Sequence, residues 1–357
     1  MQKKVFVGLS GGVDSALAAY LLKEQGYDVV GVFIKNWDGE KEQCTIRKDL
    51  KDAKEIAQQL KITFHSIDFI DEYREYVFDY FLDSLEKGLT PNPDIFCNKY
   101  VKFKAFYDWA MSQGADFVAT GHYAQINNHE QMLSGVDPVK DQTYFLYAID
   151  KQNLAKIKFP LGELKKTQVR QLAKTINLSV CDKKDSTGIC FIGAKNFKHF
   201  IQKYLPVKKG AIITKCGVHV GEHSGITFYT LGQRSGLNIG GLKQFDGRPW
   251  YIIKKDFTKN QLIISQEKND SLLMSDSLTC NNFHWLTDPL TTSFKAQARI
   301  RHGQTKQECW VYPSKGNPSE VKIKFLTSQR AITPGQAAVL YAKDLCLGGG
   351  TIINDEL

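Results

Sequence analysis

The stretch that decides the fold is Lys4-Val5-Phe6-Val7-Gly8-Leu9-Ser10-Gly11-Gly12-Val13-Asp14-Ser15. An apolar run ends in a glycine turn, and Val13–Gln25 then shows helical spacing of apolar residues. The two glycines let the backbone turn sharply, and the free N–H groups at the helix start, with the serine hydroxyls, suit an oxyanion. No Walker A or GxGxxG pattern is present. The turn therefore predicts a phosphate-binding loop; the alternative is a glycine turn that only connects two elements.

Strands and helices alternate through the first third of the chain. The pattern predicts further strands at Asp28–Ile34, Ile62–Ile67 and Asp116–Thr120, and helices at Leu50–Leu60, Glu72–Leu85 and Tyr100–Ser112. Such alternation is typical of an α/β fold with a doubly wound parallel sheet, which binds ligands at the carboxyl ends of its strands. We interpret the aromatic residues of 72–85 as core contacts. We expect helical character to continue to about Tyr204.

Beyond Leu205-Pro206 the apolar pattern changes to period two. Trp250–Lys254 and Gln261–Ser265 are spaced like a hairpin, and Phe294–Arg301 and 321–325 alternate apolar with polar residues. These segments predict two small β-rich domains, the last a β-barrel. We expect a catalytic domain over residues 1–204, a central domain over 205–274 and the barrel over 275–357.

The composition is that of an ordinary soluble globular protein. The 357 residues are 42% hydrophobic and 24% charged, which excludes a disordered or collagen-like chain. No apolar run approaches the roughly 18 residues that cross a membrane, and the first apolar stretch is too short for a signal peptide. The eight cysteines show no C-x-x-C spacing, which argues against a zinc knuckle. We expect reduced thiols, a cytoplasmic location and no membrane association.

The net charge of +9 is unevenly distributed. Residues 1–150 carry 16 Lys/Arg against 23 Asp/Glu, whereas residues 151–220 carry 15 against 3. A basic middle beside an acidic first domain suggests a polyanionic partner. The alternative is a lysine-rich solvated surface.

Two cysteines lie in distinctive surroundings. In Thr90-Pro-Asn-Pro-Asp-Ile-Phe-Cys97 the prolines predict a stiff loop before a helix, whose N-terminus would favour a Cys97 thiolate, with Asp94 placed to move a proton. Two lysines precede Cys190 in Lys183-Lys-Asp-Ser-Thr-Gly-Ile-Cys190. Taken singly, each cysteine is a structural thiol. Beside a nucleotide-activating loop, a sulfur nucleophile could displace an oxygen that AMP has activated.

Eight segments together resemble one family. In order they are SGGVDS, TPNPDIFCNKYVKFKAF, ATGHYA, KDQTYFL, KKDSTGICFIG, TLGQR, ITPGQAAVLY and CLGGG. The chain resembles the tRNA-uridine 2-sulfurtransferases, or tRNA-specific 2-thiouridylases, of the N-type ATP pyrophosphatase superfamily, from Lys4 to about Gly350. The resemblance implies a sheet of the adenine-nucleotide alpha-hydrolase type, a barrel that contacts tRNA, and an enzyme that makes 2-thiouridine at the wobble position.

The resemblance also implies roles for particular residues. The ATP-binding positions are Gly8, Leu9, Ser10, Gly11, Gly12, Val13, Asp14, Ser15, Ile34 and Gly121. Asp14 would help to place Mg²⁺ on the phosphates, and no standing protein metal site is expected. ATP would adenylate the uridine O2, a Cys190 persulfide would deliver sulfur to C2, and Cys97 would resolve it as a disulfide. Cys97, Cys190 and Asp94 are therefore the expected catalytic residues.

The implied tRNA contacts are spread along the chain. They are Asn92, Pro93, Asp94, His122, Lys140, Asp141, Gln142, Arg301, His302 and Gln336. Without the family, 140–142 would be an ordinary polar turn. The family commonly has Arg-Tyr where this chain has Arg301-His302, which leaves the role of His302 open. The expected partners are tRNA and a cysteine desulfurase or sulfur-relay protein, and we expect a monomer.

Three alternatives stay open at this point. The first is an AMP-forming pyrophosphatase-type ligase or thiolase that acts on another acceptor. The second is a non-catalytic RNA-binding protein, which the intact phosphate turn disfavours. The third concerns the cofactor: Asp94, Cys97 and Cys190 could hold an iron–sulfur cluster, which we do not favour.

Overall fold

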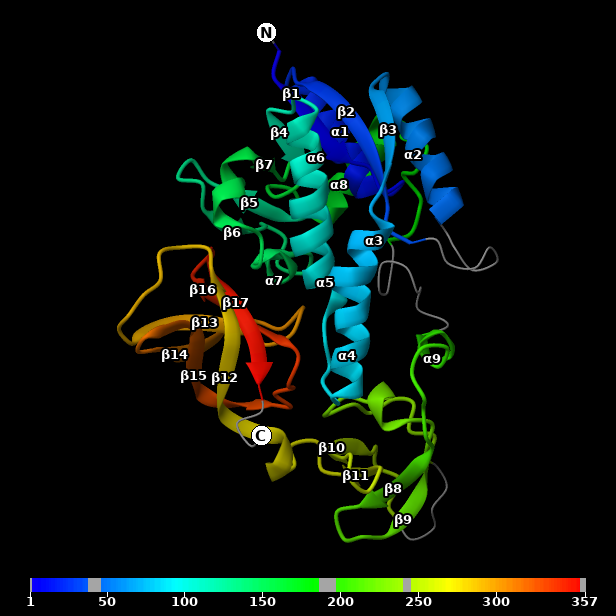
Figure 1. The fold of residues 1–357 in the computed structure, drawn as a ribbon, viewed down its shortest axis with the longest axis vertical. Coiled ribbons are helices and arrows are strands. Elements are labelled where there is room, and N and C mark those ends of the chain that lie inside the picture. Colours follow the sequence, from blue (N-terminus) through cyan, green and yellow to red (C-terminus); the bar gives the residue numbers. More distant parts are fainter. Residues whose placement is uncertain (1, 38–45, 186–196, 240–244, 354–357) are drawn as a thin grey trace.

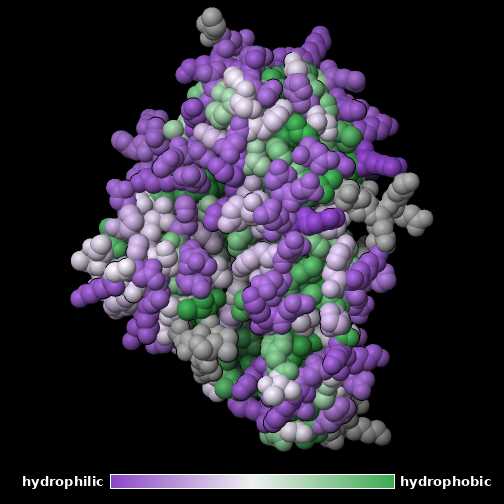
Figure 2. Space-filling view, in the orientation of Figure 1, coloured by the Kyte–Doolittle hydropathy of each residue, from purple (hydrophilic) through white to green (hydrophobic). Residues whose placement is uncertain are grey.

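Three β-sheets organise the chain in the computed structural model, which describes residues 2–37, 46–185, 197–239 and 245–353. A parallel sheet with its helices lies at the end of the molecule near the N-terminus, and a small sheet lies at the opposite end of the long axis (Figure 1). A barrel lies between them, beside a long pair of helices. Hydrophilic side chains cover most of the face seen in Figure 2. No helix of the described ranges combines the length and apolarity needed to span a membrane.

The parallel sheet has five strands in the order β3-β2-β1-β4-β7. Their bounds are β1 Lys4–Gly8, β2 Asp28–Lys35, β3 Thr63–Asp68, β4 Phe117–Ala119 and β7 Ile157–Lys158. Val5 and Val7 pack against α1 (Val13–Glu24), α2 (Ile46–Leu60) and α8 (Lys166–Thr175), while Phe6 packs on the other face with α6 (Phe106–Ser112). Helices thus cover both faces, which confirms the doubly wound fold. The strand order reverses between β1 and β4, the place where such sheets bind ligands.

Two long helical rods carry the sheet's connections toward the barrel. The first joins α3 (Ile70–Tyr73), the π-helical η1 (Arg74–Asp79) and α4 (Tyr80–Glu86); the second joins α5 (Pro93–Phe96), the π-helical η2 (Cys97–Ala105) and α6. The second rod begins seven residues before the predicted start at Tyr100, because Pro93 occupies its first turn and the Asn92 side chain accepts a hydrogen bond from the Asp94 N–H.

The aromatic stripe of the first rod is only partly a core contact. Tyr73, Phe78 and Phe81 are buried, as predicted, and Tyr80 is partly buried. Tyr76 is 42% exposed, so the prediction is wrong there. Tyr76 instead stacks on Tyr100 of the second rod, with ring centroids 5.2 Å apart.

The expectation of continuous helical character up to Tyr204 is wrong. That region holds β5 (Ala124–Ile126), β6 (Met132–Ser134) and β7 besides α7 (Thr143–Leu146), the 3₁₀ helix η3 (Lys151–Lys156), α8 and α9 (Phe197–Ile201). β5 and β6 pair with each other, and β6 pairs with β17 of the barrel. A distant strand therefore decides the structure of this short segment, which local spacing could not reveal.

The small sheet has the order β10-β11-β8-β9. Its strands are β8 Gly210–Thr214, β9 His219–His223, β10 Tyr251–Asp256 and β11 Gln261–Ser265, and the 3₁₀ helix η4 (Ile226–Phe228) lies between β9 and β10. β10 and β11 pair antiparallel, which confirms the predicted hairpin. Ile212, Ile252, Leu262 and Ile264 form the centre of its core.

The carboxyl-terminal strands close into a barrel, as predicted. After the 3₁₀ helix η5 (Ser271–Leu273) they are β12 Met274–Trp285, β13 Phe294–Arg299, β14 Gln307–Ser314, β15 Asn317–Arg330, β16 Ala337–Ala342 and β17 Leu345–Ile353. Pairing of β12 with β17 closes the ring. Val321, Ile323 and Phe325 point inward and the lysines between them are exposed, so the period of two indicated the buried face.

Candidate active site

The turn between β1 and α1 has the geometry of an anion site. Ser15 Oγ accepts a hydrogen bond from the Ser10 N–H and donates one to the Gly12 carbonyl, both at 3.1 Å. Gly11 has φ +73°, and a Cβ there would lie 2.4 Å from the Asp49 carbonyl oxygen, so only glycine fits. No side chain caps the first N–H groups of α1. These groups stay available for a phosphate.

Asp14 in the first turn of α1 is held by two neighbours. Both carboxylate oxygens accept from Lys166 Nζ at 2.7 Å, and Oδ1 also accepts from the Tyr123 hydroxyl at 2.8 Å. Burial, and then the charge of Asp14, raise the pKa of Tyr123 far above its usual value. The phenol therefore stays a hydrogen-bond donor, and Asp14 stays in a fixed position.

The start of the second cysteine motif lies against this turn. Lys183 Nζ donates to the Gly11 carbonyl at 2.9 Å and to Asp49 and Asp52 of α2 at 2.8 and 2.5 Å. Asp185 accepts from Lys140 at 2.8 Å and Arg170 at 2.6 Å, and pairs with Lys166 at 2.8 Å. Burial opposes ionisation of Asp185, but its lysine partners lower its pKa far below the usual value. The motif and the phosphate loop thus form one ionic network.

Five residues of this network were missed by sequence reasoning. They are Asp49, Asp52, Tyr123, Lys166 and Arg170. A signal existed for two of them, because Lys166 and Arg170 are four residues apart and so share one face of α8. The two aspartates, by contrast, lie in an ordinary amphipathic helix, and nothing local marks them.

The remaining expected ATP positions differ in what they offer. A Cβ at Gly121 would lie 2.7 Å from the Asp14 carbonyl carbon and the Ser15 nitrogen, so this turn touches the first turn of α1. Leu9 and Val13 are 1% and 3% exposed and belong to the core. Ile34 is partly buried on the neighbouring strand β2. The structure therefore brings Gly8–Ser15 and Gly121 together at one sheet edge.

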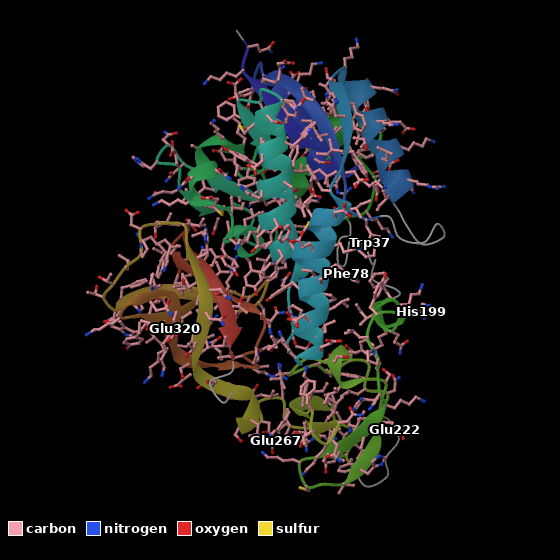
Figure 3. All side chains as sticks on the ribbon, viewed as in Figure 1. Trp37, Phe78, His199, Glu222, Glu267 and Glu320 are labelled. Carbon is pink, nitrogen blue, oxygen red and sulfur yellow. The ribbon has the colours of Figure 1, made fainter. Side chains whose placement is uncertain are left out.

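Cys97 lies in a different environment, within an aromatic cluster. It is 1% exposed and packs with Trp37, Tyr73, Val77, Phe78 and Val101. Phe200 of α9 covers this cluster, its ring centroid 5.8 Å from those of Trp37 and Phe78, which Figure 3 labels. Cys97 follows the whole of α5, whereas it was expected at the helix start. Because the helix dipole acts within the first turn, its effect on this thiol is weaker than expected.

The loop before Cys97 is held by the barrel. The Thr90 N–H donates to the Pro334 carbonyl at 2.9 Å, and Gln336 Nε2 donates to the Thr90 carbonyl at 2.6 Å. A Cβ at Gly335, where φ is +89°, would lie 2.8 Å from the Thr90 nitrogen. The loop at Gly335 therefore fits closely against the loop that precedes Asn92, Pro93 and Asp94.

Asn98 and His302 both contact Phe145. Asn98 Nδ2 donates to the Phe145 carbonyl at 3.1 Å, while its buried Oδ1 has no partner among the described residues. The exposed His302 ring lies 4.5 Å from the Phe145 ring. Burial, and then Arg299, lower the pKa of His302. A neutral, exposed ring beside the Cys97 loop remains suited to stacking.

Two other expected tRNA residues make internal contacts. The Arg301 guanidinium donates to the Ala331 carbonyl at 2.6 Å and to Thr333 Oγ1 at 3.2 Å. His122 Nδ1 lies 2.7 Å from Thr120 Oγ1, and burial, followed by Lys102, lowers its pKa well below the usual value. Arg301 therefore links its loop to residues 331–333, whereas His122 holds its own turn in position.

The described residues offer no resident metal centre. No group of three or more His, Cys, Asp or Glu that could hold an ion occurs in the described ranges. Both oxygens of Asp14 already accept from Lys166. Cys44 and Cys190 lie outside the described residues, so of the expected cluster ligands Asp94, Cys97 and Cys190 only the first two are described.

The parallel sheet, with a phosphate turn at its reversal point and lysines around it, defines a nucleotide-binding protein of the adenine-nucleotide alpha-hydrolase class. Three family models together match most of the chain. Residues 3–194 match the tRNA methyl transferase HUP domain, residues 198–266 the tRNA methyl transferase PRC-barrel domain, and residues 275–352 the aminomethyltransferase beta-barrel domain.

Curated relatives then identify the family. The chain is 50% identical over 356 residues to the tRNA-specific 2-thiouridylase MnmA of Streptococcus uberis, covering 98% of this chain and 95% of the relative. It is 47% identical over 358 residues to that of Proteus mirabilis, covering 98% and 97%. The chain belongs to the tRNA-specific 2-thiouridylase family. A solved U34-tRNA thiolase, NcsA from Methanococcus maripaludis, aligns over 56% of this chain and 63% of its own with 22% identity and a TM-score of 0.35, too distant to carry an argument.

Proposed function

We propose that this protein uses ATP to convert the wobble uridine of tRNA into 2-thiouridine. The family membership supports the reaction, and the two regions described above support a division of labour. The phosphate loop activates the uridine oxygen, and the thiol region handles the sulfur. Residues 1–204, 205–274 and 275–357 would act as catalytic, central and tRNA-contacting domains.

In the activating half, the uridine O2 attacks the α-phosphorus of ATP and pyrophosphate leaves. The uncapped N–H groups of α1 and the Ser10 and Ser15 hydroxyls would bind phosphate oxygens. Lys166 and Lys183, both within bonding distance of this loop, would offset the phosphate charge. Mg²⁺ on the phosphates would further reduce the repulsion of the attacking oxygen.

In the sulfur half, the terminal sulfur of a Cys190 persulfide attacks C2 of the adenylated uridine. Cys97 then attacks Cys190 Sγ, and the bond between the two persulfide sulfurs breaks with its electron pair moving to the transferred sulfur. AMP leaves as the C2 thiocarbonyl forms, and a Cys97–Cys190 disulfide remains, which a thiol reductant must reduce before the next turnover. Asp94, three residues before Cys97, would move the proton.

One observation carries this assignment. Asp185, five residues before Cys190 in the sequence, is bonded within the phosphate-loop network, and Phe200, ten residues after it, packs on the Cys97 cluster. The segment that contains Cys190 therefore connects the two regions that the reaction must join. A persulfide carrier between them suits both steps.

The partners follow from the same proposal. The basic segment 151–220 would meet the tRNA backbone, and the target base would leave its stack, because C2 is unreachable inside it. Asn92, Pro93, Asp94, His302 and Gln336 would surround that base. A cysteine desulfurase or sulfur-relay protein would supply the persulfide, and the enzyme would act as a cytoplasmic monomer.

Nucleoside mass spectrometry tests the proposal. Unmodified tRNA is incubated with the protein, Mg-ATP and a persulfide donor, with the Cys190→Ser variant alongside. We expect 2-thiouridine with the wild type alone. AMP formation on another acceptor, with no thiouridine in tRNA, would favour the alternative of a ligase or thiolase with a different substrate. Visible absorbance of anaerobically purified protein that is lost in Cys97→Ala would favour the iron–sulfur cluster.

A further inference from the structure

Lys140, Asp141 and Gln142 form a turn between the phosphate loop and the barrel, and each holds a different partner. Lys140 Nζ donates to Asp185 at 2.8 Å. Gln142 Oε1 accepts from the Tyr123 N–H at 3.0 Å, and the Gln142 N–H donates to the Tyr123 carbonyl at 2.9 Å. Asp141 between them accepts from Arg299 Nη1 of barrel strand β13. The turn is thus a three-way junction.

The Asp141 carboxylate is enclosed on all sides. Its side chain is 1% exposed and that of Arg299 is 9% exposed. Asp141 Oδ1 also accepts from the Gly135 N–H at 3.2 Å and from Thr143 Oγ1 at 2.9 Å. Thr143 Oγ1 lies 3.1 Å from the hydroxyl of Tyr341, a fully buried residue of β16. This carboxylate has almost no surface with which to meet RNA, although the resemblance implied such a contact.

Two hydrogen-bonded routes lead from the neighbours of Asp141 to Asp14 in the phosphate loop. One runs from Lys140 through Asp185 to Lys166, which donates to both Asp14 oxygens. The other runs from Gln142 through Tyr123, whose hydroxyl donates to Asp14. Because Lys140 and Gln142 flank Asp141 directly, the anchor of Asp141 fixes where both routes begin.

We propose that Asp141 is a positioning residue: held by Arg299 of the barrel, it aligns Lys140 and Gln142 so that Lys166 and Tyr123 keep Asp14 in place for ATP. The proposal rests on the proposed function and adds a role to the barrel. Besides meeting tRNA, the barrel supports the nucleotide site through one buried ion pair. Breaking a buried pair leaves a charge unpaired, so the junction is sensitive to either partner.

The test separates positioning from RNA contact. Asp141→Asn and Arg299→Lys are compared with the wild type in tRNA-dependent AMP formation. We expect kcat to fall about 10- to 100-fold, since a displacement near 1 Å has effects of that size. The KM for tRNA should stay within about twofold, since no RNA ligand is lost. Gln297→Ala, on the same strand but bonded to Glu308, is the matched control and should behave as wild type.

Folding and ATP binding are measured independently. Thr143→Val keeps the side-chain shape, removes the hydroxyl that bonds Asp141, and should weaken binding of Mg-ATP to the enzyme without tRNA, whereas Thr143→Ser should restore it. The thermal unfolding midpoint of every variant is measured, and the binding and kinetic assays are run well below it. A raised KM for tRNA with unchanged kcat, or unchanged ATP binding in Thr143→Val, would overturn the proposal. If Thr143→Val weakens ATP binding but the wild-type protein forms no 2-thiouridine, the proposed function fails while the positioning role of Asp141 stands.

Discussion

The phosphate loop and the Cys97 region are held in place by opposite means. Around the phosphate loop, Asp14, Lys166, Lys183 and Asp185 form ion pairs and hydrogen bonds of 2.5 to 2.9 Å. Cys97 instead lies in an aromatic cluster, and the loop before it is fixed by two hydrogen bonds to the barrel. Charge organises the first region, while apolar packing and interdomain contact organise the second.

This difference indicates how the two proposed half-reactions would depend on the rest of the chain. In the proposed mechanism the charges that would bind the phosphates lie within residues 10–185. The thiol region needs Pro334 and Gln336, which lie more than 200 residues after Thr90 in the sequence. We therefore expect substitutions in the two regions to separate ATP activation from sulfur transfer.

The largest separation is expected at the cysteines. Cys97→Ala and Cys190→Ser should each lower 2-thiouridine formation by more than about a thousandfold, as loss of a nucleophile does. Pyrophosphate release in the first turnover with tRNA should stay within about threefold of wild type, because the ionic network is untouched. Alanine at 97 avoids an unpaired hydroxyl in the apolar cluster. Cys181→Ser, at a partly buried thiol, is the control. Thiolation retained by Cys190→Ser would contradict the assignment.

The opposite separation, in which ATP binding is weakened more than sulfur transfer, is expected at Lys166. Lys166→Met removes the cation shared by Asp14 and Asp185, and it should weaken ATP binding about 10- to 100-fold, the usual cost of losing a close charged contact. Thiolation at saturating ATP should fall less. Titration calorimetry with Mg-ATP measures the effect, and Lys165→Met, an exposed neighbour, is the control. Unchanged affinity would exclude Lys166 from the nucleotide site.

A glycine in the barrel tests the thiol region. Gly335→Ala strains a backbone at φ +89° and places a Cβ 2.8 Å from Thr90, so it should lower the free energy of unfolding by about 1–3 kcal/mol. Thiolation should drop while Mg-ATP affinity does not. Gly316→Ala, at φ +85° in open space, carries the same strain without the contact. Equal effects of the two variants on thiolation would show that the contact with Thr90 is unimportant.

The smallest effect concerns acid sensitivity beside the phosphate loop. Burial lowers the pKa of His122 below its unfolded value of 6.5, so protonation favours the unfolded chain. The contribution of His122 to the free energy of unfolding is therefore complete above about pH 6.5. Below that pH, the free energy of unfolding decreases by up to about 1.4 kcal/mol per pH unit for one proton. His122→Asn should reduce that slope by about one proton in denaturant titrations between pH 7 and 5. His129→Asn, at an exposed turn, should leave that slope unchanged. Equal slopes in the two variants would show that His122 is not the source of the acid sensitivity.

Much of this arrangement could be predicted from the sequence. The strand, glycine turn and helix at residues 4–25 specify the sheet and its ligand edge, because their signals are local. The barrel strands followed from alternation, as at Val321 and Ile323. The hairpin of β5 and β6 could not be predicted, because its partner β17 lies about 210 residues away. Asp49 and Asp52 were missed for the same reason: only the fold brings Lys183 to them.

A single turnover without reductant tests the persulfide mechanism most directly. Enzyme carrying a persulfide is mixed with Mg-ATP and unmodified tRNA, then quenched with an alkylating agent and digested. Peptide and nucleoside mass spectrometry count the Cys97–Cys190 disulfide and the 2-thiouridine in the same sample. The proposed mechanism predicts one disulfide for each thiouridine, and neither in Cys190→Ser. Thiouridine formed without that disulfide would contradict it.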